Sequence, residues 1–481
     1  MTVPALTPAD LRRHLGNDLR GLRPPRTAIV VGAGLAGLAA AHELHRAGCE
    51  VTVLEATERP GGRARTLRQP FADGLRVEAG AMTVTPECHY VTHYRERLGV
   101  GLDRSDLLDQ DFSYFVDGKF VRPDADSLTT AELPLAEHER GLGVPELIAR
   151  YVTAAAEELG ADLTAPHWAP SAALEELDQS SVDEVLRARG ASQTAIDLME
   201  PMFLEMRGGD LLSASALSWL RHESGYRSLL TSTEGWGKIG GGTDELPRAF
   251  AHELRDRIRY RAPVVRLDQD DDSATVTYLD HGRLARLSAD RVVVTVPFSA
   301  IRHVDVSHAR LTAAKIEAMR KLRYASIVRV YLQVREQFWK GHNVSVSTDL
   351  PIRWVRDATA NQPGPRRILE VLMTGWRARA VAAMTGEERV RFVLDHVDTM
   401  FPGAHEQFEL GVSVAWDHEP WIEGSYVLPE RGHSRLMPAI RAPENRIHFA
   451  GEHTSFEPNG GSMNYALESG VRAFVELSTA G

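Results

Sequence analysis

Six residues near one end of the sequence have the types and spacing of a phosphate-binding turn. The run GAGLAG at 32–37 follows an apolar stretch at 27–31 and precedes a segment rich in alanine and leucine. In such a turn Gly32 allows a tight reversal, Gly34 lets a pyrophosphate approach the backbone, and Gly37 lets the helix pack close to the strand. The sequence therefore predicts a strand, a turn and a helix whose N-terminus faces a dinucleotide.

A carboxylate and an arginine-rich segment indicate which dinucleotide this is. Glu55 ends a second predicted strand, where a carboxylate holds ribose hydroxyls and repels a 2′-phosphate. The segment RPGGRART at 59–66 follows it directly. Its glycines permit close approach and Arg63 can neutralise a phosphate, which suits a flavin dinucleotide extended across the domain better than a nicotinamide one.

A second glycine loop lies near the other end of the sequence. The run GGSM at 460–463 immediately precedes a predicted helix over 463–477. Amides at that helix N-terminus would point at the flavin pyrimidine edge, where negative charge develops on reduction. Taken alone, this segment leaves open a glycine loop without a ligand.

Composition excludes several classes of protein. The 66 acidic and 55 basic residues give a formal charge of −11, which offers no basic footprint for nucleic acid. No stretch approaches the roughly 20 apolar residues of a membrane span. The histidines, such as His89 and His453, show no metal-ligand spacing, so we expect no metal site. Only two cysteines occur, Cys49 and Cys88, which favours a reducing, cytoplasmic location.

Segments of α/β character are separated by two insertions, the first mainly helical and the second mixed. We expect an N-terminal extension, a discontinuous FAD-binding domain and a substrate-binding domain. Their predicted bounds are 1–25 for the extension, 26–85, 235–300 and 442–481 for the FAD-binding domain, and 86–234 and 301–441 for the substrate-binding domain.

The sequence resembles the flavin-containing amine oxidase superfamily, which includes monoamine, polyamine and L-amino acid oxidases. The resemblance spans 28–475 and is carried by VVGAGLAGLAAAHEL, VLEATERPGGRART, VEAGAMTV, GGTDELPRAF, VVVTVPFSAI, VREQFW, AWDHEPWIEGSY and IHFAGEHT. It implies an α/β fold with a Rossmann-like FAD-binding part of the two-dinucleotide-binding-domain (GR2) type and a mixed α+β substrate domain.

The resemblance also implies which residues hold FAD. They are Gly32, Gly34, Gly37, Glu55, Ala56, Arg63, Ala81, Met82, Val264, Gly451, Glu452, Gly461, Ser462 and Met463. Some family members attach the flavin to a cysteine just before a substrate-site tyrosine. Here Ser425 precedes Tyr426, so we expect noncovalent FAD.

Two positions depart from the family pattern for substrate binding. The family usually has a lysine in the strand before the FW pair, and here the corresponding residue is Arg329. L-amino acid oxidases usually follow the GxM segment with an arginine that binds the substrate carboxylate, and here Thr83 stands there. Arg329 cannot act as a base, but its planar fork can bind a carboxylate, carbonyl or enolate oxygen. Replacement of lysine without a change of role stays open, because 50 of the 55 basic residues are arginines.

A third departure concerns the two aromatic rings that often frame the substrate nitrogen. Tyr426 matches one ring, whereas the second position is Ser462. The small side chain makes room for a bulky substrate, unless Trp421 or Phe456 fills the gap.

We therefore predict a flavin amine oxidase that takes a hydride from an amine, amino acid or amide and forms an imine. Arg329 and Tyr426 are the catalytic candidates, and Thr83, Trp421 and Ser462 are the substrate-site candidates. We expect O2 as acceptor, giving H2O2, with a dehydrogenase as the open alternative, and the departures favour specialised biosynthesis. Alternatives are an oxidase that also promotes cyclisation, a C–C desaturase and a low-turnover flavin-binding module. The expected partner is a small-molecule amine, and a homodimer stays open.

Overall fold

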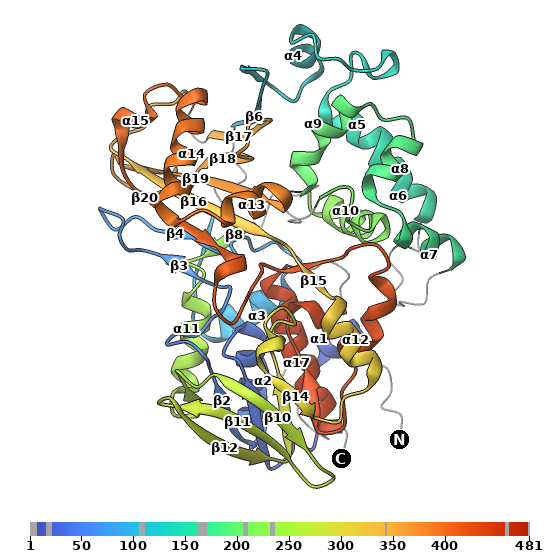
Figure 1. Ribbon diagram of the computed structural model, residues 1–481, viewed down its shortest axis with the longest axis vertical. Coiled ribbons are helices and arrows are strands. Elements are labelled where there is room, and N and C mark those ends of the chain that lie inside the picture. The colour runs from blue at the N-terminus through green and yellow to red at the C-terminus, as the bar shows by residue number, and fades with distance from the viewer. Residues whose placement is uncertain are drawn as a thin grey trace.

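The computed structural model of the 481-residue chain places the two segments predicted to bind a dinucleotide in one half and a large sheet in the other (Figure 1). A group of helices lies beside that sheet, at the upper right of the figure. The structure describes residues 7–15, 22–104, 111–160, 163, 171–204, 210–230, 236–341, 344–456 and 461–479. Gly460 of the predicted C-terminal loop lies outside them. No helix among these residues is long and apolar enough to cross a membrane.

A five-stranded sheet forms the centre of the first half, in the order β22-β13-β1-β2-β9. Its strands are β1 (Thr27–Val31), β2 (Glu50–Leu54), β9 (Ile258–Arg259), β13 (Arg291–Val294) and β22 (Ile447–Phe449). All four pairings are parallel. Because a parallel sheet is covered on both faces, its strands are continuous apolar runs. The predicted α/β fold is confirmed.

Two helices cover this sheet beside the first glycine turn. Helix α2 (Leu35–Arg46) follows the turn, and α17 (Met463–Thr479) packs against it. A β-carbon at Gly470 would lie 2.3 Å from the Ala36 carbonyl oxygen, so the two helices approach closely there. Gly48, at φ +89°, ends α2 as expected. Helices α1 (Pro8–Leu15), α3 (His89–Arg97), α11 (Glu245–Glu253), α12 (Ala313–Lys321) and α16 (Met437–Arg441) also lie in this half.

A four-stranded sheet lies at the lower edge of Figure 1, in the order β12-β11-β10-β14. Its strands are β10 (Val264–Gln269), β11 (Ala274–Asp280), β12 (Arg283–Ala289) and β14 (Asp305–His308). Strand β14 comes from just beyond the boundary predicted at residue 300.

The upper half contains a seven-stranded sheet in the order β20-β16-β19-β18-β17-β6-β7. Its strands are β6 (Asp111–Val116), β7 (Lys119–Val121), β16 (Ile327–Val334), β17 (Val344–Thr348), β18 (Trp354–Asp357), β19 (Arg367–Thr374) and β20 (Phe408–Ala415). The parallel pairing of β6 with β17 joins the two insertions in one sheet. Helices α13 (Gly375–Ala382) and α14 (Gly386–Met400) pack on it.

Seven helices of the first insertion form a cluster at the upper right of Figure 1. They are α4 (Ala125–Thr130), α5 (Val144–Ile148), α6 (Ala154–Leu159), α7 (Ala172–Gln179), α8 (Val182–Ala188), α9 (Gln193–Leu204) and α10 (Ala216–Leu230). Tyr151, Leu186, Met199 and Leu217 are among the buried residues of its separate apolar core.

Candidate active site

One cavity of about 1240 Å³ runs between the two halves and brings the predicted site residues together. Its wall contains Arg329, Tyr426, Thr83, Trp421 and Ser462 together with every residue predicted to bind FAD except Gly37. Ligand pockets usually measure roughly 300–1,000 Å³, so this cavity has room for a dinucleotide and a second molecule.

The glycine turn leaves open space at one position and is tightly packed at another. A β-carbon at Gly34 would meet no protein atom within 4 Å, and Gly34 itself lines the cavity. A β-carbon at Gly37 would lie 2.0 Å from the Gly32 carbonyl oxygen, which explains why Gly37 is outside the cavity wall. Gly34 thus provides the open approach that a pyrophosphate needs, whereas Gly37 allows the helix to pack.

Glu55 is buried at the end of β2 and fixed by backbone amides. Its Oε2 accepts from the amide of Ala33 at 2.7 Å, and its Oε1 accepts from the amide of Thr57 at 2.9 Å. The Thr57 hydroxyl donates to the same Oε1 at 2.7 Å. A carboxylate has about four acceptor sites, so Glu55 keeps capacity for hydroxyl groups of a ligand.

Arg63 and Glu452 join the two predicted FAD-binding ends of the chain. Arg63 Nη1 lies 2.8 Å from Glu452 Oε1 and also donates to the Ser425 carbonyl oxygen. Glu452 Oε2 accepts from the Gly461 amide at 3.3 Å. Because Arg63 is already paired with Glu452, it would neutralise only part of the charge of a bound phosphate. The N-terminus of α2 would supply further positive potential.

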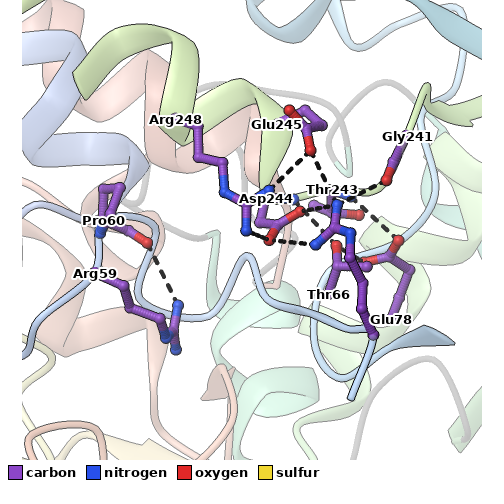
Figure 2. A network of polar contacts seen from close by, with 10 residues as sticks. Arg59, Pro60, Thr66, Glu78, Gly241, Thr243, Asp244, Glu245 and Arg248 are labelled. Atoms are coloured by element: carbon purple, nitrogen blue, oxygen red, sulfur yellow. Dashed lines mark hydrogen bonds and ion pairs between the residues drawn. The ribbon is translucent and has the colours of Figure 1, made fainter. Parts of the chain in front are cut away.

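A polar network behind the cavity fixes the segment after the arginine-rich run (Figure 2). The Thr66 hydroxyl donates to Glu78 Oε2 at 2.8 Å, and the Thr243 amide donates to Glu78 Oε1 at 3.1 Å. Burial, the largest effect, raises the pKa of Glu78. The Thr243 hydroxyl donates to the Ala81 carbonyl at 2.9 Å. This network holds the segment that carries Ala81 and Met82 into the cavity wall.

Arg329 points from β16 into the cavity, but one of its nitrogens is bound by the protein. Nη1 donates to Glu370 Oε1 at 2.7 Å and to the Glu78 carbonyl oxygen at 3.0 Å. Burial disfavours the charge, yet Glu370, Tyr331 and Tyr426 outweigh it, so the pKa of Arg329 is raised. A substrate can therefore meet a fixed cation, mainly through the remaining edge of the guanidinium.

Tyr426 lies near enough to Arg329 to help raise the pKa of the guanidinium, and the tyrosine ring packs on Gly461. A β-carbon at Gly461 would lie 2.8 Å from Tyr426 Cγ, so only glycine fits beside the ring. The Ser462 hydroxyl accepts from the Asn464 amide at 3.1 Å at the start of α17. Trp421 and Phe456 both line the cavity, so both alternatives to a one-sided aromatic frame stay open.

Sequence reasoning missed the wall formed by the seven-stranded sheet. Leu372 of β19 is the register partner of both Arg329 and Trp354, and Trp354 Nε1 donates to the Ser345 hydroxyl at 2.7 Å. Phe112 of β6 and His222 of α10 also line the cavity. Strand alternation from Arg329 predicts which β16 residues share its face, but the neighbouring strands become known only with the sheet order.

The family model described as flavin containing amine oxidoreductase matches residues 35–477. The chain therefore belongs to this family and is an oxidoreductase of the flavin amine oxidase type. Family membership implies a flavin cofactor. Among the described residues, no cluster of three or more His, Cys, Asp or Glu could hold a metal ion.

Two proteins named as L-amino acid oxidases and one solved amine oxidase structure are similar to this chain over nearly its full length. The Bacillus subtilis (strain 168) protein YobN, whose name gives L-amino-acid oxidase as a provisional activity, is 28% identical, with 98% of each chain covered. The L-amino acid oxidase of Bothrops pictus is 26% identical over 96% of this chain and 92% of its own. The structure of cyclohexylamine oxidase from Brevibacterium oxydans IH-35A is 23% identical, with a TM-score of 0.78, and the match covers 95% of this chain and 99% of that one.

Proposed function

We propose that this protein binds FAD noncovalently and oxidises the C–N bond of a small amine, amino acid or amide to an imine, with O2 as acceptor and H2O2 as product. The observation that carries the proposal is the single cavity that joins the dinucleotide-binding turn to Arg329 and Tyr426. When bound, FAD supplies the hydride acceptor. A role in specialised biosynthesis fits the departures at Thr83, Arg329 and Ser462.

The residues at the dinucleotide end fit FAD. Gly34 leaves the backbone open to a pyrophosphate, and the N-terminus of α2 supplies positive potential. Glu55 would hold ribose hydroxyls, and Val264 would contact adenine through its backbone. Gly451, Glu452, Gly461, Ser462 and Met463 would line the ribityl and pyrimidine side. In this proposal residues 26–85, 235–300 and 442–481 form the FAD-binding domain and 86–234 with 301–441 form the substrate-binding domain, except that α3 and β14 pack with the FAD-binding domain.

Noncovalent binding is supported by the side chains near the flavin-linking position. Ser425 lies there and has no thiol to offer. Cys88 also lines the cavity, but its thiol contacts the Thr85 hydroxyl at 3.5 Å, and burial, the largest effect, raises its pKa. A protonated thiol is a poor nucleophile. Both cysteines are free, in keeping with a reducing, cytoplasmic location.

At the substrate end, Arg329 would hold an anionic or carbonyl oxygen and Tyr426 would flank the substrate nitrogen. Arginine stays protonated and cannot take a proton from the substrate. We therefore assign it to binding and orientation. Trp354, Leu372 and Phe112 would surround the apolar part of the substrate and exclude water.

The test is anaerobic mixing of the yellow protein with a panel of amines and amino acids while the flavin absorbance is followed. Bleaching by at least one C–N substrate, followed by H2O2 formation on admission of air, is expected. Product analysis by mass spectrometry separates an open imine or its hydrolysis product from a cyclised or desaturated one. A protein that no substrate bleaches would be a flavin-binding module. Acid treatment should release intact FAD, and flavin retained on the denatured chain would contradict noncovalent binding.

A further inference from the structure

Six side chains of the seven-stranded sheet line the substrate end of the cavity, namely Phe112, Ile327, Arg329, Ser345, Trp354 and Leu372. Arg329, Leu372 and Trp354 are register partners on the adjacent strands β16, β19 and β18, so they follow one another across the sheet (Figure 1). Strands lie about 4.8 Å apart, which places Trp354 roughly 10 Å from Arg329 along the sheet. A molecule lying on this wall therefore meets a cation, then an aliphatic side chain and then an indole.

A second row of side chains on the same face is buried behind this wall. It contains Tyr331, Glu370 and Arg356, each two positions along its strand from a residue of the first row. Since side chains alternate along a strand, both rows face the same way. Glu370 forms ion pairs with Arg329 and Arg356. The second row thus holds Arg329 from behind, and on these three strands it is the first row that meets a molecule in the cavity.

The Trp354 indole is fixed by a hydrogen bond to the neighbouring strand. Its Nε1 donates to the Ser345 hydroxyl at 2.7 Å, whereas the register partner of Trp354 on β17 is Ser347. Ser345 is therefore a diagonal neighbour on the same face, within reach of a long side chain. Because a serine hydroxyl is one bond from Cβ, it holds the indole nitrogen close to the sheet. The ring consequently lies along the wall, with one face toward the cavity that it lines.

This hydrogen bond also determines which chemistry the ring offers to a ligand. The indole N–H is a donor only, and Ser345 already accepts it, so the ring presents its apolar face. Phe112, the register partner of Ser345 on β6, lies partly exposed in the same wall. Among the described residues, this sheet contributes no carboxylate to the wall, so it offers no partner to a second ammonium group of a diamine. This part of the cavity therefore suits a flat apolar ring.

We propose that Ser345 fixes the Trp354 indole as a stacking surface, and that this surface makes the site select substrates that end in a flat aromatic ring. In such a substrate a short linker joins the ring to the amine-bearing carbon and to an oxygen group held by Arg329. Trp354 is the specificity residue that touches the ring, and Ser345 is a positioning residue that acts through Trp354. The catalytic consequence rests on the proposed oxidation, whereas ligand binding tests the stacking surface by itself.

Two acids that differ only in their ring are the probes, 3-phenylpropanoate and 3-cyclohexylpropanoate. Both carry a carboxylate for Arg329 and neither has an amine to be oxidised. Calorimetry on the FAD-loaded protein gives their dissociation constants. Wild type should bind the phenyl acid about three- to tenfold more tightly, the range of an aromatic pair beyond its buried area. Without stacking, the saturated ring should bind at least as tightly, because it has more apolar surface to bury.

Trp354→Leu keeps an apolar side chain but removes the ring, and should abolish the preference for the phenyl acid. Ser345→Ala removes the acceptor and frees the indole, and should lower the preference by about twofold or more. Ser347→Ala is the matched control, because Ser347 is equally buried on the same strand, opposite Trp354 and outside the cavity wall. It should leave both dissociation constants unchanged. FAD content and melting temperature show whether each variant is intact, and Trp354→Leu keeps the test valid if Ser345→Ala fails to fold.

A double-mutant cycle separates positioning of the ring from general packing. If Ser345 acts only through the indole N–H, Ser345→Ala should change neither dissociation constant once Trp354→Phe has removed that N–H. An equal effect of Ser345→Ala in both backgrounds would mean that the serine acts on the ligand directly, and would overturn its positioning role.

Three binding results would overturn the stacking surface: equal affinities of wild type for the two acids, binding of neither acid, or an unchanged preference in Trp354→Leu. As the catalytic readout, the ratio of kcat/KM for phenylalanine over 3-cyclohexylalanine should fall in Trp354→Leu and in Ser345→Ala. If no amine or amino acid reduces the flavin while the acid series holds, the proposed oxidation fails and the stacking surface stands. If the flavin is reduced but neither variant changes the ratio, the oxidation stands and the stacking surface fails.

Discussion

The two ends of the cavity are lined by different types of residue. The end that we propose for the dinucleotide contains many small residues, with Gly32, Gly34, Gly62 and Ala81 in its wall. The substrate end is mostly large side chains, with Phe112, Trp354, Leu372 and Tyr426 around Arg329. A ligand that lies along the backbone is bound by main-chain amides and needs open space there. Substitutions that add side-chain volume should therefore weaken binding most at that end. A ligand that meets side chains is recognised by charge and shape, so changes of chemistry should matter most at the other.

The largest effect should come from Gly37→Val, which affects the fold as well as the ligand. The new β-carbon would lie 2.0 Å from the Gly32 carbonyl oxygen, a contact that requires the turn and α2 to separate. We expect loss of soluble folded protein or a strongly lowered melting temperature, measured by circular dichroism. A folded variant with full FAD content would show that close packing of this turn is not needed.

Gly34→Val is the matched change that should spare the fold. Gly34 has φ −70° and ψ 173°, which any residue can adopt, and no protein atom lies within 4 Å of its β-carbon position. The side chain would occupy the approach of the pyrophosphate. We expect wild-type circular dichroism and loss of bound FAD, measured by absorbance near 450 nm. Full FAD content in this variant would refute the assignment of the turn.

Glu55→Gln should weaken FAD binding without abolishing it. It removes a charge-assisted hydrogen bond and turns an amide group toward the Ala33 N–H, which costs about 1.5–3 kcal/mol, roughly ten- to 150-fold in affinity. Activity at saturating FAD should be retained. Glu50→Gln, on the exposed start of the same strand, is the control. Equal FAD affinity in the two variants would mean that the ribose is held elsewhere.

Arg329→Lys should have the smallest effect on the cofactor and a clear effect on substrate. Lysine keeps the charge but loses the planar fork, so a nitrogen held by Glu370 and the Glu78 carbonyl as Nη1 is leaves no second guanidinium edge for the substrate. Flavin reduction by a confirmed substrate should fall at least tenfold, about 1.4 kcal/mol. Stopped-flow mixing without oxygen measures it, with FAD content unchanged. Equal or faster reduction would mean that arginine only replaces the usual lysine.

The dinucleotide end could be predicted from the sequence because its chemistry is local. GAGLAG, Glu55 and the GGR segment lie within 32–63, and glycine spacing specifies their conformation directly. The substrate end could not, because its wall joins strands far apart in the chain. Arg329, Glu370 and Arg356 meet only through the order β16-β19-β18. A single charged residue inside the apolar run ILEVLM at 368–373 was the available signal for a buried ion pair, but it does not identify the partner.

The place of β22 at the sheet edge has a consequence for how the protein matures on the ribosome. Strands β1 and β2 emerge early, yet β22, Glu452 and the α17 face that covers α2 come from the end of the chain. At roughly 5–20 residues per second, synthesis of residues 55–446 takes roughly 20–80 s. During that time α17 is not yet available to pack against the apolar face of α2. Under the proposed function, Glu452 and Gly461 complete the FAD site only after that time, so we expect FAD to bind once synthesis of the chain is nearly complete.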